Sequence, residues 1–343
     1  MHGCPIVLLI ACLAWTLHAV SVDDFLDLSY SAPGYSEPMR YRLFVPRNYV
    51  STKKYPLVLF LHGCCGCGDN RCHADNGPCL AWAQDSNQAK NPCFVLAPQV
   101  LTNKTWVDWS WGNITDRIAL TASDSGVKIS TSMKMVIEIL QDLKTKYALD
   151  TTRFYVTGYS MGGWGAWDII IRRPDLFAAA IPICGGGDTS KILRIVNMSV
   201  WAFHGDKDDV IPFQNSVLMI AALEKAGGAP RHTWFAGCGH NSWDPAYSDP
   251  QLLPWAFRQV KNQNTSVAIA DPSRMINTRF DPGRKFKGRV PDEQTGWRVI
   301  LDPQGKIARL KPSRPGHNQS ADACLIIHPS NDRAVGAAMI IKK

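Results

Sequence analysis

The sequence predicts an α/β fold built on a mainly parallel sheet, followed by a small β-rich module. Continuous apolar runs recur along the chain, and such runs are typical of strands buried on both faces of a parallel sheet. Helical patterns separate these runs, as expected for βαβ units. After about residue 264 the long helical patterns stop and hairpin-like stretches follow.

Predicted strands and helices alternate from about residue 41 to residue 235. The clearest strand is an apolar run over residues 56–61, and the clearest helix begins at residue 130 or 131. A second helix covers residues 217–225 and stops at two glycines. Because the loops after parallel strands meet at one edge of the sheet, functional residues are expected directly after the strands. The other predicted strands are residues 41–46, 94–98, 154–157, 178–183, 200–205 and 232–235.

The first 21 residues have the pattern of a signal peptide. An apolar run over residues 6–15 stops before Asp23, and it is too short to span a bilayer. The sequence therefore predicts an exported protein, secreted or periplasmic, with no transmembrane segment in the mature chain. An alternative is a lipoprotein, because residues 9–12 fit a lipobox in which Cys12 would be acylated.

The length of 343 residues suits one large domain with a small appendage. We place the large domain at residues 22–262 and the C-terminal module at residues 263–343. Residues 265–343 hold 14 Lys plus Arg against 7 Asp plus Glu, so this module carries nearly all of the chain's net charge of +8. A basic module suits contact with an acidic polysaccharide or surface, and the alternative is a solvated β-module whose positive charge is incidental. Nucleic acid is not expected, because no basic run or RNA-binding aromatic signature is present.

The cysteine pattern predicts disulfide bonds. Six of the 11 cysteines lie between Cys64 and Cys93, a density that suits an oxidising compartment. Cys184 and Cys238 are a further conceivable pair. The alternative is a zinc site in the 64–79 cluster, but no paired C-x-x-C knuckles occur there, so no metal is predicted. Nine cysteines remain after the leader, which leaves one thiol without an intramolecular partner.

Residues 158–162, Gly-Tyr-Ser-Met-Gly, form a G-x-S-x-G motif between a predicted strand and a predicted helix. In this context the motif is a nucleophile elbow. The turn that presents Ser160 is so tight that small residues are needed two positions before and two after it. The sequence therefore predicts Ser160 as a catalytic nucleophile.

A serine nucleophile needs a base, and the base needs an acceptor that orients it. Asp208 follows the strand at 200–205, and His240 follows the strand at 232–235. The order Ser, Asp, His is that of α/β-hydrolases. We predict His240 as the base and Asp208 as its partner. Asp206 and Asp209 are the alternative carboxylates, and His204 is assigned a structural role.

The tetrahedral intermediate of acyl transfer needs two N–H donors. One is predicted to be the backbone N–H of Met161, directly after the nucleophile. The other is expected after residues 62–63, most simply from Cys64, with Cys65 as the alternative.

Four tryptophans are candidates for binding substrate. Trp106, Trp109 and Trp111 follow a strand end, and Trp243 lies three residues after the predicted base. Aromatic side chains of this kind stack on sugars or on phenolic acyl groups. Packing in the core is the equal alternative.

Several blocks of this chain resemble a group of predicted peptidases and esterases in the α/β-hydrolase superfamily. These blocks are residues 56–70, the elbow with Trp164 and Trp167, and residues 181–188, 204–212 and 239–247. The group is related to polyhydroxybutyrate depolymerases, feruloyl esterases and prolyl-oligopeptidase-type hydrolases. The resemblance covers about residues 38–260, and it implies the α/β-hydrolase fold with Ser160, Asp208 and His240 as a triad.

The leading functional hypothesis is a serine hydrolase of carboxylic esters, with feruloyl or acetyl esters of polysaccharide as the nearest analogy. It needs no cofactor. The alternatives are a prolyl-oligopeptidase-type peptidase and a polyester depolymerase. A non-enzyme alternative is a surface-binding protein on a vestigial hydrolase scaffold, but such a protein has no physical need for an intact Ser160, Asp208 and His240.

Overall fold

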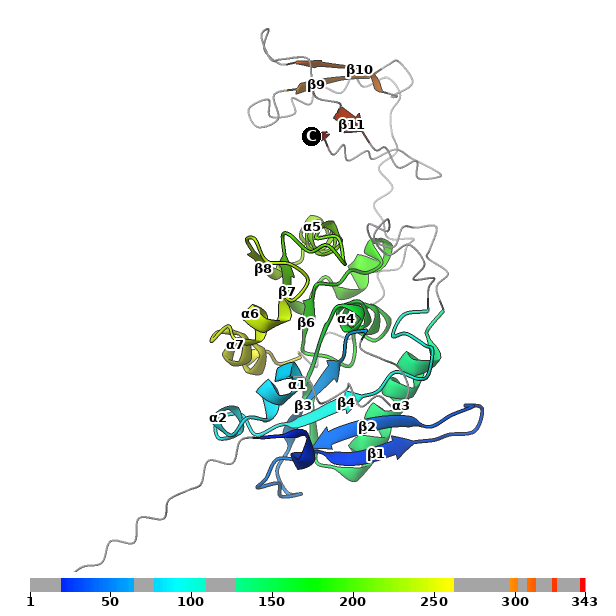
Figure 1. The fold of residues 1–343 in the computed structure, drawn as a ribbon, viewed down its shortest axis with the longest axis vertical. Coiled ribbons are helices and arrows are strands. Elements are labelled where there is room, and N and C mark those ends of the chain that lie inside the picture. Colours follow the sequence, from blue (N-terminus) through cyan, green and yellow to red (C-terminus); the bar gives the residue numbers. More distant parts are fainter. Residues whose placement is uncertain are drawn as a thin grey trace, which may run out of the picture. The chain divides into compact units, whose positions relative to one another are not determined.

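The computed structural model describes residues 20–64, 77–108 and 128–261, together with the backbone of four short strands between residues 297 and 342. The chain divides into two compact units, residues 1–273 and 274–343. The first unit is an α/β domain, which Figure 1 shows with its helices packed on a twisted sheet.

Among the described residues of the first unit, eight strands form one sheet in the order β1-β2-β4-β3-β5-β6-β7-β8. The pairs β1/β2 and β2/β4 are antiparallel, and the strands from β4 to β8 are parallel. Their carboxyl ends therefore meet at one edge of the sheet. The strands are β1 (Leu26–Tyr30), β2 (Met39–Phe44), β3 (Tyr55–Leu61), β4 (Phe94–Pro98), β5 (Leu149–Tyr159), β6 (Ala179–Ile183), β7 (Ser199–Gly205) and β8 (Arg231–Phe235).

Side chains of the central strands fill two hydrophobic clusters, one on each face of the sheet. In β3, Leu57, Leu59 and Leu61 point into one cluster, and Val58 and Phe60 point into the other. Both sets are apolar because both faces are covered, which explains the continuous apolar run in the sequence.

The helices cover both faces of the sheet. The first cluster is closed by α3 (Thr131–Lys146), α4 (Met161–Arg172) and α5 (Gln214–Lys225). The second is closed by α1 (Gly77–Ala83), α6 (Trp243–Tyr247) and α7 (Leu252–Arg258). The remaining short helices are α2 (Asp85–Gln88), η1 (Val22–Asp24) and η4 (Thr189–Ile195). Ser130 caps α3 by accepting a hydrogen bond from the N–H of Met133.

Each predicted strand and both predicted helices are present, with boundaries shifted by a few residues. Strand β1 was not predicted, because it is an exposed edge strand whose side chains lack the apolar run of the buried strands. The second unit contains two antiparallel pairs: β9 (Trp297–Leu301) with β10 (Ile307–Pro312), and β11 (Ala323–Leu325) with β12 (Ile340–Lys342). Both pairs lie after residue 264, where the sequence predicts hairpin-like stretches.

The predicted signal peptide and Cys12 lie outside the described residues. No helix in the described part of the chain is both long enough and apolar enough to span a membrane.

Candidate active site

Ser160 lies on a strained turn between β5 and α4. Its φ of 55° is a conformation that non-glycine residues rarely adopt. The turn brings the start of α4 against the end of β3, where a Cβ on Gly162 would overlap the carbonyl of Leu61. A Cβ on Gly158 would lie 2.5 Å from the carbonyl oxygen of Gly162. Both glycines of the motif are therefore required by close backbone contacts.

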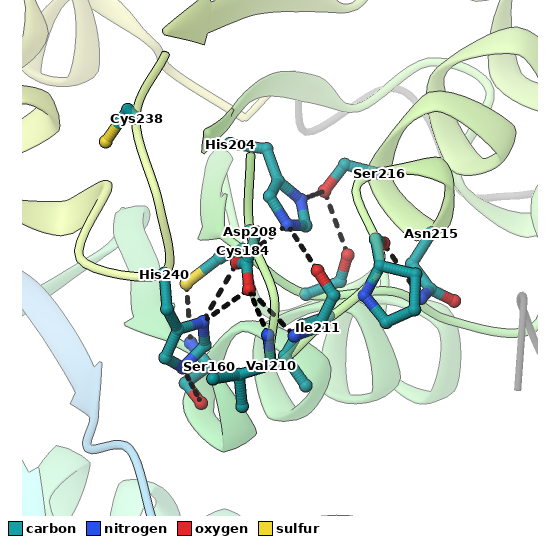
Figure 2. Close-up of polar contacts among 12 residues, drawn as sticks. Ser160, Cys184, His204, Asp208, Val210, Ile211, Asn215, Ser216, Cys238 and His240 are labelled. Atoms are coloured by element: carbon teal, nitrogen blue, oxygen red, sulfur yellow. Dashed lines mark hydrogen bonds and ion pairs between the residues drawn. The ribbon is translucent and has the colours of Figure 1, made fainter. Parts of the chain in front are cut away.

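His240 meets Ser160 at the carboxyl edge of the sheet. It lies in the loop between β8 and α6, and its Nε2 is 3.0 Å from Ser160 Oγ (Figure 2). Its Nδ1 is 2.9 Å from Oδ2 of Asp208. Because the carboxylate accepts from Nδ1–H, Nε2 is the unprotonated nitrogen and can accept the serine proton.

Both carboxylate oxygens of Asp208 accept hydrogen bonds. Oδ1 accepts from the backbone N–H groups of Val210 and Ile211 at 2.9 and 2.8 Å. Oδ2 accepts from His204 Nε2 at 3.1 Å, in addition to the contact with His240. Burial alone would raise the pKa of Asp208, but these hydrogen bonds outweigh it and hold the pKa well below its usual range. The carboxylate therefore stays ionised and fixed in orientation.

His204 is a second histidine on the same carboxylate. Its Nε2 faces two acceptors, Asp208 Oδ2 and the carbonyl of Ile211, each at 3.1 Å, so Nε2 carries a proton. Its Nδ1 lies 2.7 Å from Ser216 Oγ, which is also 2.9 Å from the carbonyl of Gly185. The ring is fully buried. The structural role expected for His204 is thus a contact with Asp208.

The alternative carboxylates lie elsewhere. Asp206 accepts from the N–H of Gly237 at 2.7 Å, which is a turn contact. Asp209 is exposed. Of the three neighbouring aspartates, Asp208 is the one that reaches His240.

The two predicted oxyanion donors are the backbone N–H groups of Met161 and Cys64. Met161 is the first residue of α4, where a backbone N–H has no partner within the helix. Cys64 is the last described residue before position 77, and it is exposed. The backbone before it is fixed, because Nδ1 of His62 lies 2.7 Å from the Gly63 carbonyl and Nε2 accepts from the N–H of Val100.

The tryptophan candidates differ in how deeply they are buried and in whether the structure describes them. Trp106 is fully buried and its indole N–H donates to the His62 carbonyl at 3.0 Å, so it is a core residue and not part of a substrate wall. Trp243 is half-buried, with its ring 5.3 Å from the His240 ring and perpendicular to it. Trp109 and Trp111 lie outside the described residues.

The cysteine predictions are corrected for the described part of the chain. Cys64, Cys79, Cys93, Cys184 and Cys238 are all free thiols. The conceivable bridge between Cys184 and Cys238 is therefore absent. The other cysteines of the 64–79 cluster lie outside the described residues.

Sequence reasoning missed two contacts at this site. The thiol of Cys184 accepts a hydrogen bond from the Ser160 N–H at 3.2 Å. The ring of Tyr159 covers Gly63, where a Cβ would lie 2.5 Å from Cε2 of the ring, and it also packs on Trp243. The sequence shows that Cys184 directly follows a predicted strand, but its contact with Ser160 depends on the pairing of β6 with the strand that leads into Ser160.

The sheet order, the elbow after β5 and the acid and histidine after β7 and β8 are those of the α/β-hydrolase fold. Residues 85–248 match the model of the Dienelactone hydrolase family.

Known proteins similar to this chain include several esterases. A bifunctional acetylxylan esterase/xylanase of Neocallimastix patriciarum is 34% identical over 82 residues, which cover 23% of this chain and 12% of that protein. A poly(3-hydroxyalkanoate) depolymerase of Paucimonas lemoignei is 30% identical over 135 residues, covering 38% of this chain and 28% of the depolymerase. A thermostable esterase of known structure is 39% identical with a TM-score of 0.64, covering 70% of this chain and 64% of the esterase. The matches thus span less than two thirds of each of these proteins.

Proposed function

We propose that this protein is a serine hydrolase of carboxylic esters, with Ser160 as nucleophile, His240 as base and Asp208 as orienting acid. The observation that carries the proposal is the contact of 3.0 Å between Ser160 Oγ and His240 Nε2, with Asp208 2.9 Å behind the imidazole. Both are hydrogen-bond distances, so the imidazole can accept the Ser160 proton while the carboxylate holds the ring in place.

The proposed reaction has two halves. Ser160 Oγ attacks the ester carbonyl while its proton passes to His240 Nε2, and the imidazolium is stabilised by Asp208. Collapse of the tetrahedral intermediate breaks the bond to the alcohol, which takes the proton from His240. Water then attacks the acyl-enzyme by the same route, and His240 returns the proton to Ser160 Oγ. The acid and the free enzyme result.

The negative oxygen of each intermediate needs donors in place before the reaction. We assign this role to the N–H groups of Met161 and Cys64. Met161 directly follows Ser160, and Gly63, the residue before Cys64, packs against the ring of Tyr159. The positive end of the α4 dipole favours negative charge beside Ser160.

The proposed substrates are acyl esters of polysaccharide, acetyl or feruloyl in type. The similarity to an acetylxylan esterase supports this class, and the half-buried ring of Trp243 beside His240 offers a surface for a sugar or phenolic ring. Hydrolysis of a polyester is the second candidate, which the depolymerase similarity favours.

Replacing Ser160 by Ala should lower kcat/KM for p-nitrophenyl acetate by about 10³-fold or more, because the nucleophile is removed. The matched control is Ser248→Ala, at an exposed position at the end of α6. Wild-type rates on acetylated xylan, methyl ferulate, poly(3-hydroxybutyrate) and a prolyl amide would rank the substrate classes. Full activity in Ser160→Ala would reject the mechanism, and a preference for the amide would favour the peptidase alternative.

We also propose that the protein is exported and that its basic C-terminal module binds an acidic polymer. The supporting observations are the leader pattern and the charge of the module. Retention on carboxylated beads, compared for the full chain and for a chain ending at residue 273, tests the second point. Equal retention of the two would reject it.

A further inference from the structure

Cys184 is a buried thiol at the candidate active site for which the proposed hydrolysis has no use. It directly follows β6, its φ is 38°, and its side chain is fully buried. The strained backbone aims the thiol at the elbow, where the Ser160 N–H donates to its sulfur at 3.2 Å. Figure 2 shows the sulfur pointing toward the imidazole of His240.

Three side chains converge at this point. The sulfur of Cys184, a carboxylate oxygen of Asp208 and a ring nitrogen of His240 all lie within 4.8 Å of one another. No other group of three such ligands occurs in the part of the chain that the structure describes. A tetrahedral zinc ion holds sulfur, nitrogen and oxygen ligands roughly 3.4–3.6 Å apart, as its bond lengths of about 2.0–2.3 Å require. The side chains need to move by only about 1 Å to reach that geometry.

We propose that Cys184, Asp208 and His240 form an inhibitory binding site for a thiophilic divalent metal ion such as Zn²⁺. Thiolate, imidazole and carboxylate are the three ligand types that zinc takes from proteins, and a water molecule would complete the coordination. The ion approaches past the imidazole of His240, whose side chain is 19% exposed. Metal binding itself does not depend on the proposed function, but the inhibition does.

The binding step balances in protons and charge. The thiol of Cys184 loses its proton to solvent, and the resulting thiolate with the carboxylate of Asp208 neutralises Zn²⁺. The ion takes the Nδ1 lone pair, so the proton of His240 moves from Nδ1 to Nε2 through solvent. No electron is transferred.

This change of tautomer stops catalysis. Nε2, which faces Ser160 Oγ at 3.0 Å, becomes a donor and can no longer accept the serine proton. The ion sits on the Nδ1 side of the ring, away from Ser160 Oγ, so substrate can still bind. The metal should therefore lower kcat and leave KM nearly unchanged.

Cys238 provides a matched control. It is also a free thiol, and it lies two residues before His240, but it is not one of the three converging ligands. Figure 2 shows it apart from the cluster. Cys238→Ser therefore removes a neighbouring thiol and leaves the proposed site intact.

Metal binding is tested first, with Co²⁺ as a spectroscopic probe for the zinc site. Thiolate ligands give Co²⁺ a charge-transfer absorption, and the 11 cysteines of the chain make comparison between variants necessary. We expect one equivalent of this absorption to be lost in Cys184→Ser and in His240→Ala and kept in Cys238→Ser. Circular dichroism of each variant checks folding, and Cys184→Ala is the second variant if the serine form does not fold. Identical spectra for wild type and Cys184→Ser would overturn the proposal.

Inhibition is tested second, with Zn²⁺ and p-nitrophenyl acetate, relative to each variant's own rate without metal. Wild type and Cys238→Ser should lose kcat with unchanged KM and recover with a chelator. Replacing a residue that only hydrogen-bonds to a metal ligand lowers metal affinity about 10- to 100-fold, and losing the ligand itself lowers it further. Cys184→Ser should therefore raise the inhibition constant for Zn²⁺ at least about 100-fold. Equal inhibition of Cys184→Ser, or competitive inhibition of wild type, would overturn the proposal. If the wild type has no esterase activity, the proposed function fails and the cobalt spectra alone decide the metal site.

Discussion

Asp208 is the residue of the candidate site that joins its two histidines. Its carboxylate accepts hydrogen bonds from two histidines and two backbone N–H groups. His240 can change partners during a reaction, whereas His204 is fully buried and held on both ring nitrogens. We infer that His204 is a positioning residue, which fixes Asp208 and through it the tautomer of His240.

Replacing His204 by Phe should lower kcat by about 10- to 100-fold with little change in KM, because Asp208 loses a donor while no contact with substrate is removed. The unfolding free energy should also fall, by about 1–3 kcal/mol. His204→Gln keeps an N–H donor and should recover part of kcat. His232→Phe, at an exposed position, is the control. Equal losses of kcat in the Phe and Gln variants would argue against a role in orientation.

The triad candidates could be predicted from sequence because each directly follows a strand and their order is that of α/β-hydrolases. The contacts of His204 and Cys184 could not, because they depend on how β6 and β7 lie beside β5. For a similar reason the sequence left open whether Trp106 packs in the core or binds substrate. Its buried bond to the carbonyl of His62 joins two segments that are distant in sequence.

At the scale of elements, the close contact of β3 with the start of α4 holds the elbow in place. Gly162 makes that contact possible, because a Cβ there would overlap the Leu61 carbonyl. The obstructing atoms belong to the backbone of a central strand, so they cannot move aside as a side chain would.

Gly162→Ala should therefore lower the unfolding free energy by more than about 3 kcal/mol, measured by urea unfolding, and should abolish turnover. Gly239→Ala is the control for stability, since its added methyl would have its nearest neighbour, the Lys207 carbonyl oxygen, at 3.9 Å. A Gly162→Ala protein as stable as Gly239→Ala would show that the two elements do not approach as closely as described.

The sequence predicts best the strands that are buried on both faces. The apolar run of β3 is continuous because its side chains pack alternately into the two hydrophobic clusters, one on each face of the sheet. The short helices α6 and α7 were missed, because five- and seven-residue helices are too brief to show a helical period.

At the scale of the whole molecule, the ionised Asp208 couples folding to pH. Its pKa is lower in the folded chain than in the unfolded chain. Its stabilising contribution is therefore complete above the unfolded pKa of about 3.9 and is lost as pH falls below it. The carboxylate itself is fully buried, so solvent does not screen this effect.

Asp208→Asn should accordingly be less stable than the wild type near neutral pH, and the difference should shrink as pH falls from about 5 to about 3. Urea unfolding at several pH values in this range measures it. Asp209→Asn, at an exposed neighbouring position, is the matched control. A difference between wild type and Asp208→Asn that stays constant over this range would contradict the described hydrogen bonds.

The architecture of the first unit could be predicted from sequence alone, because its strands alternate with helices and the sheet follows from that alternation. The free thiols of Cys184 and Cys238 could not, since cysteine number and spacing do not fix which sulfur atoms meet.

Base activation of Ser160 is tested by labelling the protein with a fluorophosphonate and locating the modified residue by mass spectrometry. Such reagents react with a serine only when a base activates it. If His240 activates Ser160, the wild type should carry one label, on Ser160, and His240→Ala should carry none at that position. A label on another residue, or undiminished labelling of Ser160 in His240→Ala, would contradict this activation.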